Sequence, residues 1–111
     1  MNIQFSYKQV DEKGRVFLED YLDKKISRLT TLLSEEILSS SRLEIRLEKF
    51  VKKEAYKVEI FLITPHKKFG AKEDDHTIIE AFDLALDKLI IQIRKDHERI
   101  LKINQANETG V

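Results

Sequence analysis

Three histidines are the first residues to test for catalytic or metal-binding chemistry. His66, His76 and His97 lie far apart in the sequence. None belongs to an H-x-x-x-H or H-E-x-x-H pattern, which would place two ligands on one face of a helix. The acidic run 73–75 lacks the ligand spacing of a calcium-binding loop and is typical of the start of a helix. We therefore interpret the histidines as solvated surface residues and expect no metal site.

Other catalytic signatures are missing from the sequence. The chain has no cysteine, which excludes thiolate nucleophiles and disulfides. Its three glycines, Gly14, Gly70 and Gly110, are isolated and cannot form a glycine-rich phosphate loop. There is no G-x-S-x-G motif either. We expect a protein without enzyme activity, catalytic residues, cofactor or small-molecule substrate.

Lysines and arginines on two predicted helices are the better candidates for a functional role. Side by side, the two helices would line a common groove of positive potential suited to phosphate groups. Solvated helix faces, with cations near a helix C-terminus, explain the same spacing equally well. The candidate RNA-binding residues are Lys24, Lys25, Arg28, Lys88, Arg94, Lys95, Arg99 and Lys102.

Net charge is zero, with twenty basic and twenty acidic residues, which argues against indiscriminate nucleic-acid binding. The charge is nevertheless polarised. Residues 42–73 carry nine basic and five acidic side chains (9 − 5 = +4), whereas residues 74–87 carry five acidic and none basic (−5). The N-terminus does not read as a signal peptide and no run is long enough to span a membrane. We expect a cytoplasmic protein.

Hydrophobic periodicity predicts the elements that must position these residues. Alternating apolar residues predict strands near 3–7, 42–48, 56–63 and 67–72, with a hairpin tip at 51–54 and a turn at 39–41. Helical periodicity predicts helices over about 13–34 and from about 77 to 102, the second capped by Thr77. On one strand face, Arg42, Arg46 and Lys57 alternate with glutamates 44, 48 and 59, a pattern of cross-strand ion pairs.

The element order β-α-β-β-β-α predicts an α+β two-layer sandwich, a four-stranded sheet with two helices packed on one face. At 111 residues the chain fits one domain. We expect this domain to cover residues 1–103. Residues 104–111 are expected to form a polar, disordered tail.

Three segments carry a resemblance to a known family. They are 46–50 (RLEKF), 56–60 (YKVEI) and 81–89, whose A-x-D-x-x-x-D-K-L pattern is the most specific. In this order and spacing they resemble the ribosome hibernation promoting factor family, which includes the ribosome-associated inhibitor and the sigma-54 modulation proteins. The resemblance covers about residues 2–102 and implies the same element order. It is to short members, without a separate C-terminal dimerisation domain.

The resemblance implies that the domain over residues 1–103 is ribosome-binding. It would bind ribosomal RNA in the decoding channel of the small ribosomal subunit and keep idle ribosomes inactive. Basic helix residues would hold the RNA backbone. Lys25, Arg28, Lys88, Lys95 and Arg99 match basic positions of the family's helices, and Lys24, Arg94 and Lys102 are neighbours able to compensate.

The sequence also departs from the family pattern. Ile91 stands where a basic residue is common, and Asp96, His97 and Glu98 dilute the positive charge of the last helix. An alternative is therefore a protein-binding or self-associating module that keeps the fold without the RNA-binding surface. Its contact patch would comprise Phe61, Ile63, Phe69, Ile90 and Ile91, although a wide buried stripe on the last helix also explains Ile90 and Ile91.

Overall fold

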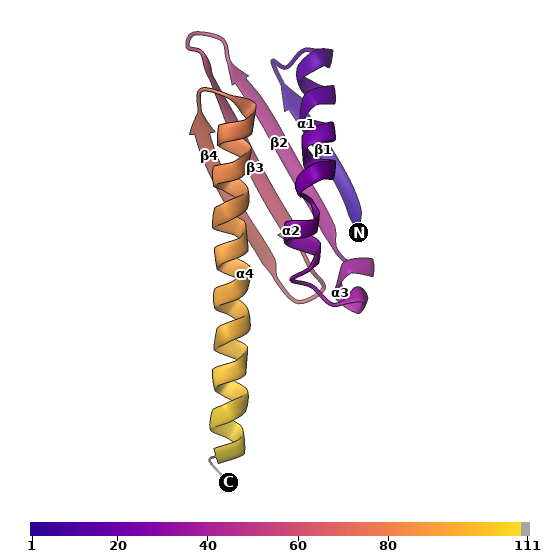
Figure 1. Cartoon of the computed structure of the whole chain (residues 1–111), viewed down its shortest axis with the longest axis vertical. Coiled ribbons are helices and arrows are strands. Elements are labelled where there is room, and N and C mark those ends of the chain that lie inside the picture. The colour runs from indigo at the N-terminus through magenta and orange to yellow at the C-terminus, as the bar shows by residue number, and fades with distance from the viewer. Residues whose placement is uncertain (110–111) are drawn as a thin grey trace.

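A computed structural model describes the backbone of residues 1–109 and the side chains of residues 1–103. The elements follow one another along the chain as Figure 1 shows. They are β1 (Asn2–Lys8), α1 (Glu12–Lys25), α2 (Ser27–Thr30), α3 (Glu35–Ser39), β2 (Arg42–Phe50), β3 (Ala55–Ile63), β4 (Lys68–Asp75) and α4 (Ile78–Thr109).

The four strands form one sheet in the order β1-β2-β3-β4. Strands β2, β3 and β4 are an antiparallel meander, whereas β1 pairs in parallel with β2 because the helical segment α1–α3 carries the chain back to the same end of the sheet. Both long helices cover one face of this sheet (Figure 1). The α+β two-layer prediction is confirmed.

The core lies between the sheet and the two long helices. Period-two alternation turns Ile45 of β2 and its register partner Ile60 of β3 inward, and both are buried. Leu18 and Leu22 of α1 and Phe82 of α4 cover them from the helix layer. None of the described helices lies over the opposite face of the sheet, so the side chains on that face form a second, open surface (Figure 1).

The helix predicted over 13–34 is interrupted. Asp11 caps α1 by accepting a hydrogen bond from the Gly14 amide (2.8 Å), and α1 ends at Lys25. After α2, the Thr31 hydroxyl donates to the Ser27 carbonyl (2.8 Å), a local bond that competes with regular helix. Ser34 then caps α3, a short helix that the sequence did not predict and that ends at Ser39, the first residue of the predicted turn 39–41.

The last helix starts as predicted, since the Thr77 hydroxyl accepts a hydrogen bond from the Glu80 amide (3.1 Å). It continues to Thr109, so the backbone of 104–109 is helical, whereas the sequence predicted a disordered tail from 104. Neither proline nor glycine occurs in this helix before Gly110, which explains why no break falls at 103. The rest of that predicted tail, 110–111, lies outside the described residues.

Candidate nucleic-acid interface

The side of α4 that faces α1 is acidic. The Tyr21 hydroxyl of α1 lies 2.8 Å from both carboxylate oxygens of Asp83. One turn further along α4, Asp87 accepts a charge-assisted hydrogen bond from the Arg28 guanidinium of α2 (2.8 Å). These two contacts hold the helix layer together. They also direct two negative charges into the seam between the helices.

The hydroxyl of Tyr21 is a feature that the sequence interpretation missed. The ring of Tyr21 packs edge-on against Phe82, with centroids 5.5 Å apart, as an apolar residue of the helix would. Burial, followed by the hydrogen bond to Asp83 and the charge of that carboxylate, raises the pKa of Tyr21 to about 12. An aspartate inside an otherwise apolar helix stripe was the sequence signal for such a partner.

The opposite flank of α4 contacts β4 and the turn that precedes it. Lys88 forms an ion pair with Glu73, and the Gln92 amide exchanges two hydrogen bonds with the Gly70 backbone (2.6 and 3.2 Å). Asp96 follows one turn later and accepts hydrogen bonds from Lys67 and Arg99. Its contact with Lys67, reinforced by Arg99, lowers the pKa of the Asp96 carboxyl. Lys88 and Arg99 therefore lie on the flank of α4 that faces away from α1.

The eight candidate residues do not line one groove between the helices. Arg28 is paired with Asp87, and the Lys25 ammonium lies 5.5 Å from the Tyr21 ring centroid. Lys88 lies on the flank of α4 away from α1, because its partner belongs to β4. The expectation of a common positive groove is wrong, since Asp83 and Asp87 occupy the positions of α4 beside Tyr21 and Arg28. Whether the eight residues bind RNA stays a prediction.

Four of the candidates share the outer side of α4 and the flank toward β4. Lys88, Lys95 and Lys102 are seven residues apart, so they follow one line along the helix at intervals of about 10 Å. In the described part of the chain, Lys95 and Lys102 are exposed and have no carboxylate within 4 Å. We call the four residues Lys88, Lys95, Arg99 and Lys102 the α4 basic strip.

Lys24 and Arg94 remain from the predicted set. Both are exposed, and neither forms an ion pair with a described residue. Arg94 follows Asp83 by eleven residues, which places it three turns further along the α1-facing side of α4. Neither residue belongs to the α4 basic strip.

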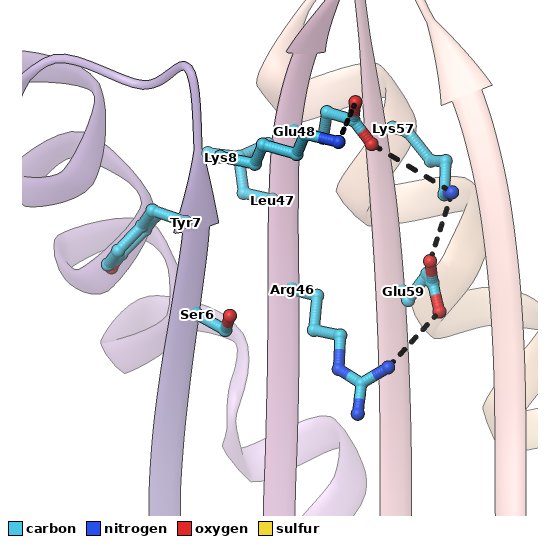
Figure 2. A pocket seen from close by; sticks show the side chains of 8 residues that line it. All are labelled: Ser6, Tyr7, Lys8, Arg46, Leu47, Glu48, Lys57 and Glu59. Carbon is cyan, nitrogen blue, oxygen red and sulfur yellow. Dashed lines mark ion pairs between the residues drawn. The ribbon is translucent and has the colours of Figure 1, made fainter.

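The open face of the sheet carries the cross-strand ion pairs that the sequence predicted. Figure 2 shows the chain of contacts from Lys8 through Glu48, Lys57 and Glu59 to Arg46. Its atoms lie 3.1 to 4.0 Å apart. These residues line a shallow hollow of about 160 Å³. Because every charged group there has an opposite charge beside it, the hollow offers no free acid, base or cation.

The apolar patch of the alternative hypothesis is divided among three surfaces. Phe61 and Ile63 lie on the open sheet face, and Phe69 lies on the helix side, packed against the core. On α4, Ile90 is 4% exposed and belongs to the core, whereas its neighbour Ile91 is 50% exposed. The wide-stripe explanation thus holds for Ile90 alone, and no single patch of these five residues exists.

Histidines and acids do not gather into a ligand set. His66, His76 and His97 are all exposed, and the described residues contain no group of three potential metal ligands. The acidic run 73–75, predicted as the start of a helix, instead forms the end of β4, and the backbone amide of His76 donates to Asp75 (2.7 Å) just before α4. None of the helices in the described part of the chain has the length and apolarity needed to cross a membrane.

The open four-stranded sheet with helices on one face is a fold that this chain shares with known proteins. The family model described as sigma 54 modulation protein / S30EA ribosomal protein matches residues 3–101, so the chain belongs to this family. Its members are ribosome-associated hibernation and subunit-interface proteins and are not known as enzymes.

Two solved structures are similar to this chain. The N-terminal domain of Protein Y from Thermus thermophilus has a TM-score of 0.68 and 24% identity, covering 86% of this chain and 98% of that one. A ribosomal subunit interface protein from Coxiella burnetii has a TM-score of 0.68 and 19% identity, covering 88% and 99%. At these identities the likeness concerns the fold. A comparison with curated proteins finds no match.

Proposed function

We propose that this protein binds ribosomal RNA in the decoding channel of the small ribosomal subunit and keeps idle ribosomes inactive. Family membership supports a ribosomal partner, and the coarse expectation of a cytoplasmic protein follows from that partner. The observation that carries the proposal is the α4 basic strip, whose Lys95 and Lys102 have no neighbouring carboxylate within the described chain.

The physical basis is phosphate binding along a straight helix. Lysines in one line can contact successive parts of an RNA backbone, and each neutralised phosphate releases counterions. The paired cations contribute less, because Arg28 and Lys88 must exchange a carboxylate for a phosphate. A net charge of zero keeps binding restricted to RNA whose shape fits this helix, rather than to any polyanion.

Inhibition of this kind requires no bond to be made or broken. A domain seated in the channel excludes messenger and transfer RNA by occupying their volume, and it leaves when they compete successfully. Neither a cofactor nor a second copy of the chain is part of this mechanism. Lys24, Lys25 and Arg94 would add secondary phosphate contacts from the helix layer.

Co-sedimentation with purified small subunits at about 50 and 200 mM salt tests the proposal. The wild type should pellet at the lower salt and largely stay in solution at the higher one. Lys88→Ala/Lys95→Ala/Arg99→Ala removes three contacts. Each full phosphate contact changes the affinity about 3.5-fold over a fourfold change in salt, so the variant should reduce the salt dependence of the affinity by up to about 40-fold. The reduction is smaller to the extent that Lys88 and Arg99 keep their carboxylate partners.

A matched control removes the same charge elsewhere. Lys13, Lys49 and Lys52 are exposed and lie outside α4, and none forms an ion pair with a described residue. The triple alanine variant at these positions should pellet like the wild type. No pelleting of the wild type at either salt, or equal loss in both triple variants, contradicts the proposal.

A further inference from the structure

The open face of the sheet ends in a small aromatic site that faces away from α4. Phe61 of β3 points to this face, and its register partner on β4 is Gly70. A Cβ atom on Gly70 would lie 2.8 Å from Phe61 Cδ1 and 3.0 Å from Cε1. The missing side chain therefore lets the Phe61 ring lie across β4. Beside the ring is an open hollow of about 290 Å³ that Lys72 also lines.

Positive charge gathers around this ring. The Arg46 guanidinium lies 5.1 Å from the ring centroid and the Lys68 ammonium lies 4.7 Å from it. Lys68 and Lys72 have no carboxylate within 4 Å among the described residues. By contrast, the remaining open-face cations of the four strands (Lys8, Arg42, Arg46 and Lys57) are paired with glutamates, several of them in Figure 2. The unbalanced positive charge of this face is thus beside Phe61.

We infer that this site, comprising Phe61, Gly70, Arg46, Lys68 and Lys72, binds an unpaired nucleotide of single-stranded RNA. Phe61 is half-buried, with its ring against Gly70 and the Lys68 ammonium over it. A base would stack on the ring in place of that ammonium, which would turn to a phosphate, and every base offers a flat face for such stacking. Lysines on either side of the ring are placed for the flanking phosphates, because Lys68 and Lys72 occupy alternate positions of β4 around Gly70.

The other chemical classes of partner fit this site less well. An isolated anion would need the lysines but not the aromatic ring. An apolar peptide would need a larger apolar area, whereas Phe61 and Ile63 are the apolar residues at this end of the open face. Paired RNA has its bases stacked inside the helix and cannot present one to Phe61. A base with phosphates on both sides uses the ring and both lysines, while Glu59, which also lines the hollow, is paired with Arg46 and Lys57.

The absence of tryptophan from the chain allows a direct spectroscopic test. In a Phe61→Trp variant the indole is the single tryptophan, and stacking of a base should quench its fluorescence. Titration with decaadenylate RNA at about 50 mM salt should quench it. A blunt RNA duplex of the same length should leave it unchanged, even where the phosphates bind elsewhere on the protein.

A second measurement does not depend on the tryptophan. Fluorescence anisotropy of labelled decaadenylate should show that Phe61→Leu weakens binding about tenfold, within the range expected for one stacked base, while Phe61→Tyr binds like the wild type. Lys68→Ala/Lys72→Ala should weaken binding and flatten its salt dependence. The control Lys13→Ala/Lys52→Ala, which removes the same charge elsewhere, should change it little.

Failure of the wild type to bind decaadenylate would overturn the inference. Equal binding by the wild type and folded Phe61→Leu would overturn it as well. Far-UV circular dichroism and the melting temperature of Phe61→Leu establish that it is folded. Quenching by the duplex would equally count against base stacking. The assay contains no ribosome and probes the face opposite the α4 basic strip, so its failure leaves the proposed function testable separately.

Discussion

The contact between Tyr21 and Asp83 should stabilise the whole helix layer, and Tyr21→Phe isolates it. The substitution removes the hydroxyl that lies 2.8 Å from both carboxylate oxygens. It keeps the ring, and with it the edge-on packing against Phe82. The only group lost is therefore the hydrogen-bond donor that joins α1 to α4.

The expected decrease in the free energy of unfolding of Tyr21→Phe follows from the charge and the exposure of Asp83. A hydrogen bond to a charged group contributes about 1.5–3 kcal/mol, and this one lies at the low end because half-buried Asp83 can recruit water in place of the hydroxyl. We expect the free energy of unfolding to fall by about 1.5 kcal/mol. For a domain of this size that corresponds to a melting temperature lower by about 6 °C.

Urea unfolding followed by far-UV circular dichroism measures this change. The slope of the unfolding free energy against urea should be unchanged, because the variant buries the same surface. Tyr56→Phe is the matched control, since the Tyr56 hydroxyl has no hydrogen-bond partner among the described residues and is not a buried unpaired group. The free energy of unfolding of Tyr56→Phe should fall by less than about 0.5 kcal/mol.

Equal stability of Tyr21→Phe and Tyr56→Phe would refute the reasoning. It would mean that Asp83 is hydrated in the native protein and that the seam between α1 and α4 is held by packing alone. A changed urea slope would also count against it, because the variant would then differ in the surface exposed on unfolding.

Three further predictions concern particular positions. Because Ile90 is 4% exposed and Ile91 is 50% exposed, Ile90→Glu should cost about 3 kcal/mol or more in urea unfolding and Ile91→Glu less than about 0.5 kcal/mol. Gly70→Ala should cost about 1 kcal/mol by displacing the Phe61 ring, and most of that cost should vanish in a Phe61→Ala background, as a double-mutant cycle would show. Since the pKa of Tyr21 is raised from 10.0 to about 12, its neutral form stabilises the fold below pH 10, and this stability is lost between pH 10 and 12. Tyr21→Phe should lack that part of the alkaline loss in pH-dependent unfolding, and identical alkaline profiles would contradict it.

The sheet could be predicted from the sequence because its two faces have opposite chemistry. Leu43, Ile45 and Leu47 alternate strictly with charged residues, and a slip of one residue would bury those charges. The same alternation predicted the ion pairs on the open face. The start of α4 was equally readable, since Thr77 and Glu80 have capping-box spacing.

The arrangement of the helix charges could not be predicted in this way. A period of 3.6 tells which residues share a face, but not which neighbour that face meets. Asp83 and Asp87 could equally have been solvated, and only the packing of α1 beside them turns their side of α4 into an acidic seam. The end of α2 and the start of α3 coincide with single local hydrogen bonds of the Thr31 and Ser34 hydroxyls, which periodicity does not detect.

Hydroxyl-radical footprinting of small-subunit ribosomal RNA, with and without the protein, tests the central claim most directly. The proposal predicts protected nucleotides clustered in the decoding channel at about 50 mM salt. They should be lost at about 200 mM salt or with Lys88→Ala/Lys95→Ala/Arg99→Ala, and retained with Lys13→Ala/Lys49→Ala/Lys52→Ala. Protection elsewhere on the subunit, or none at either salt, would contradict it.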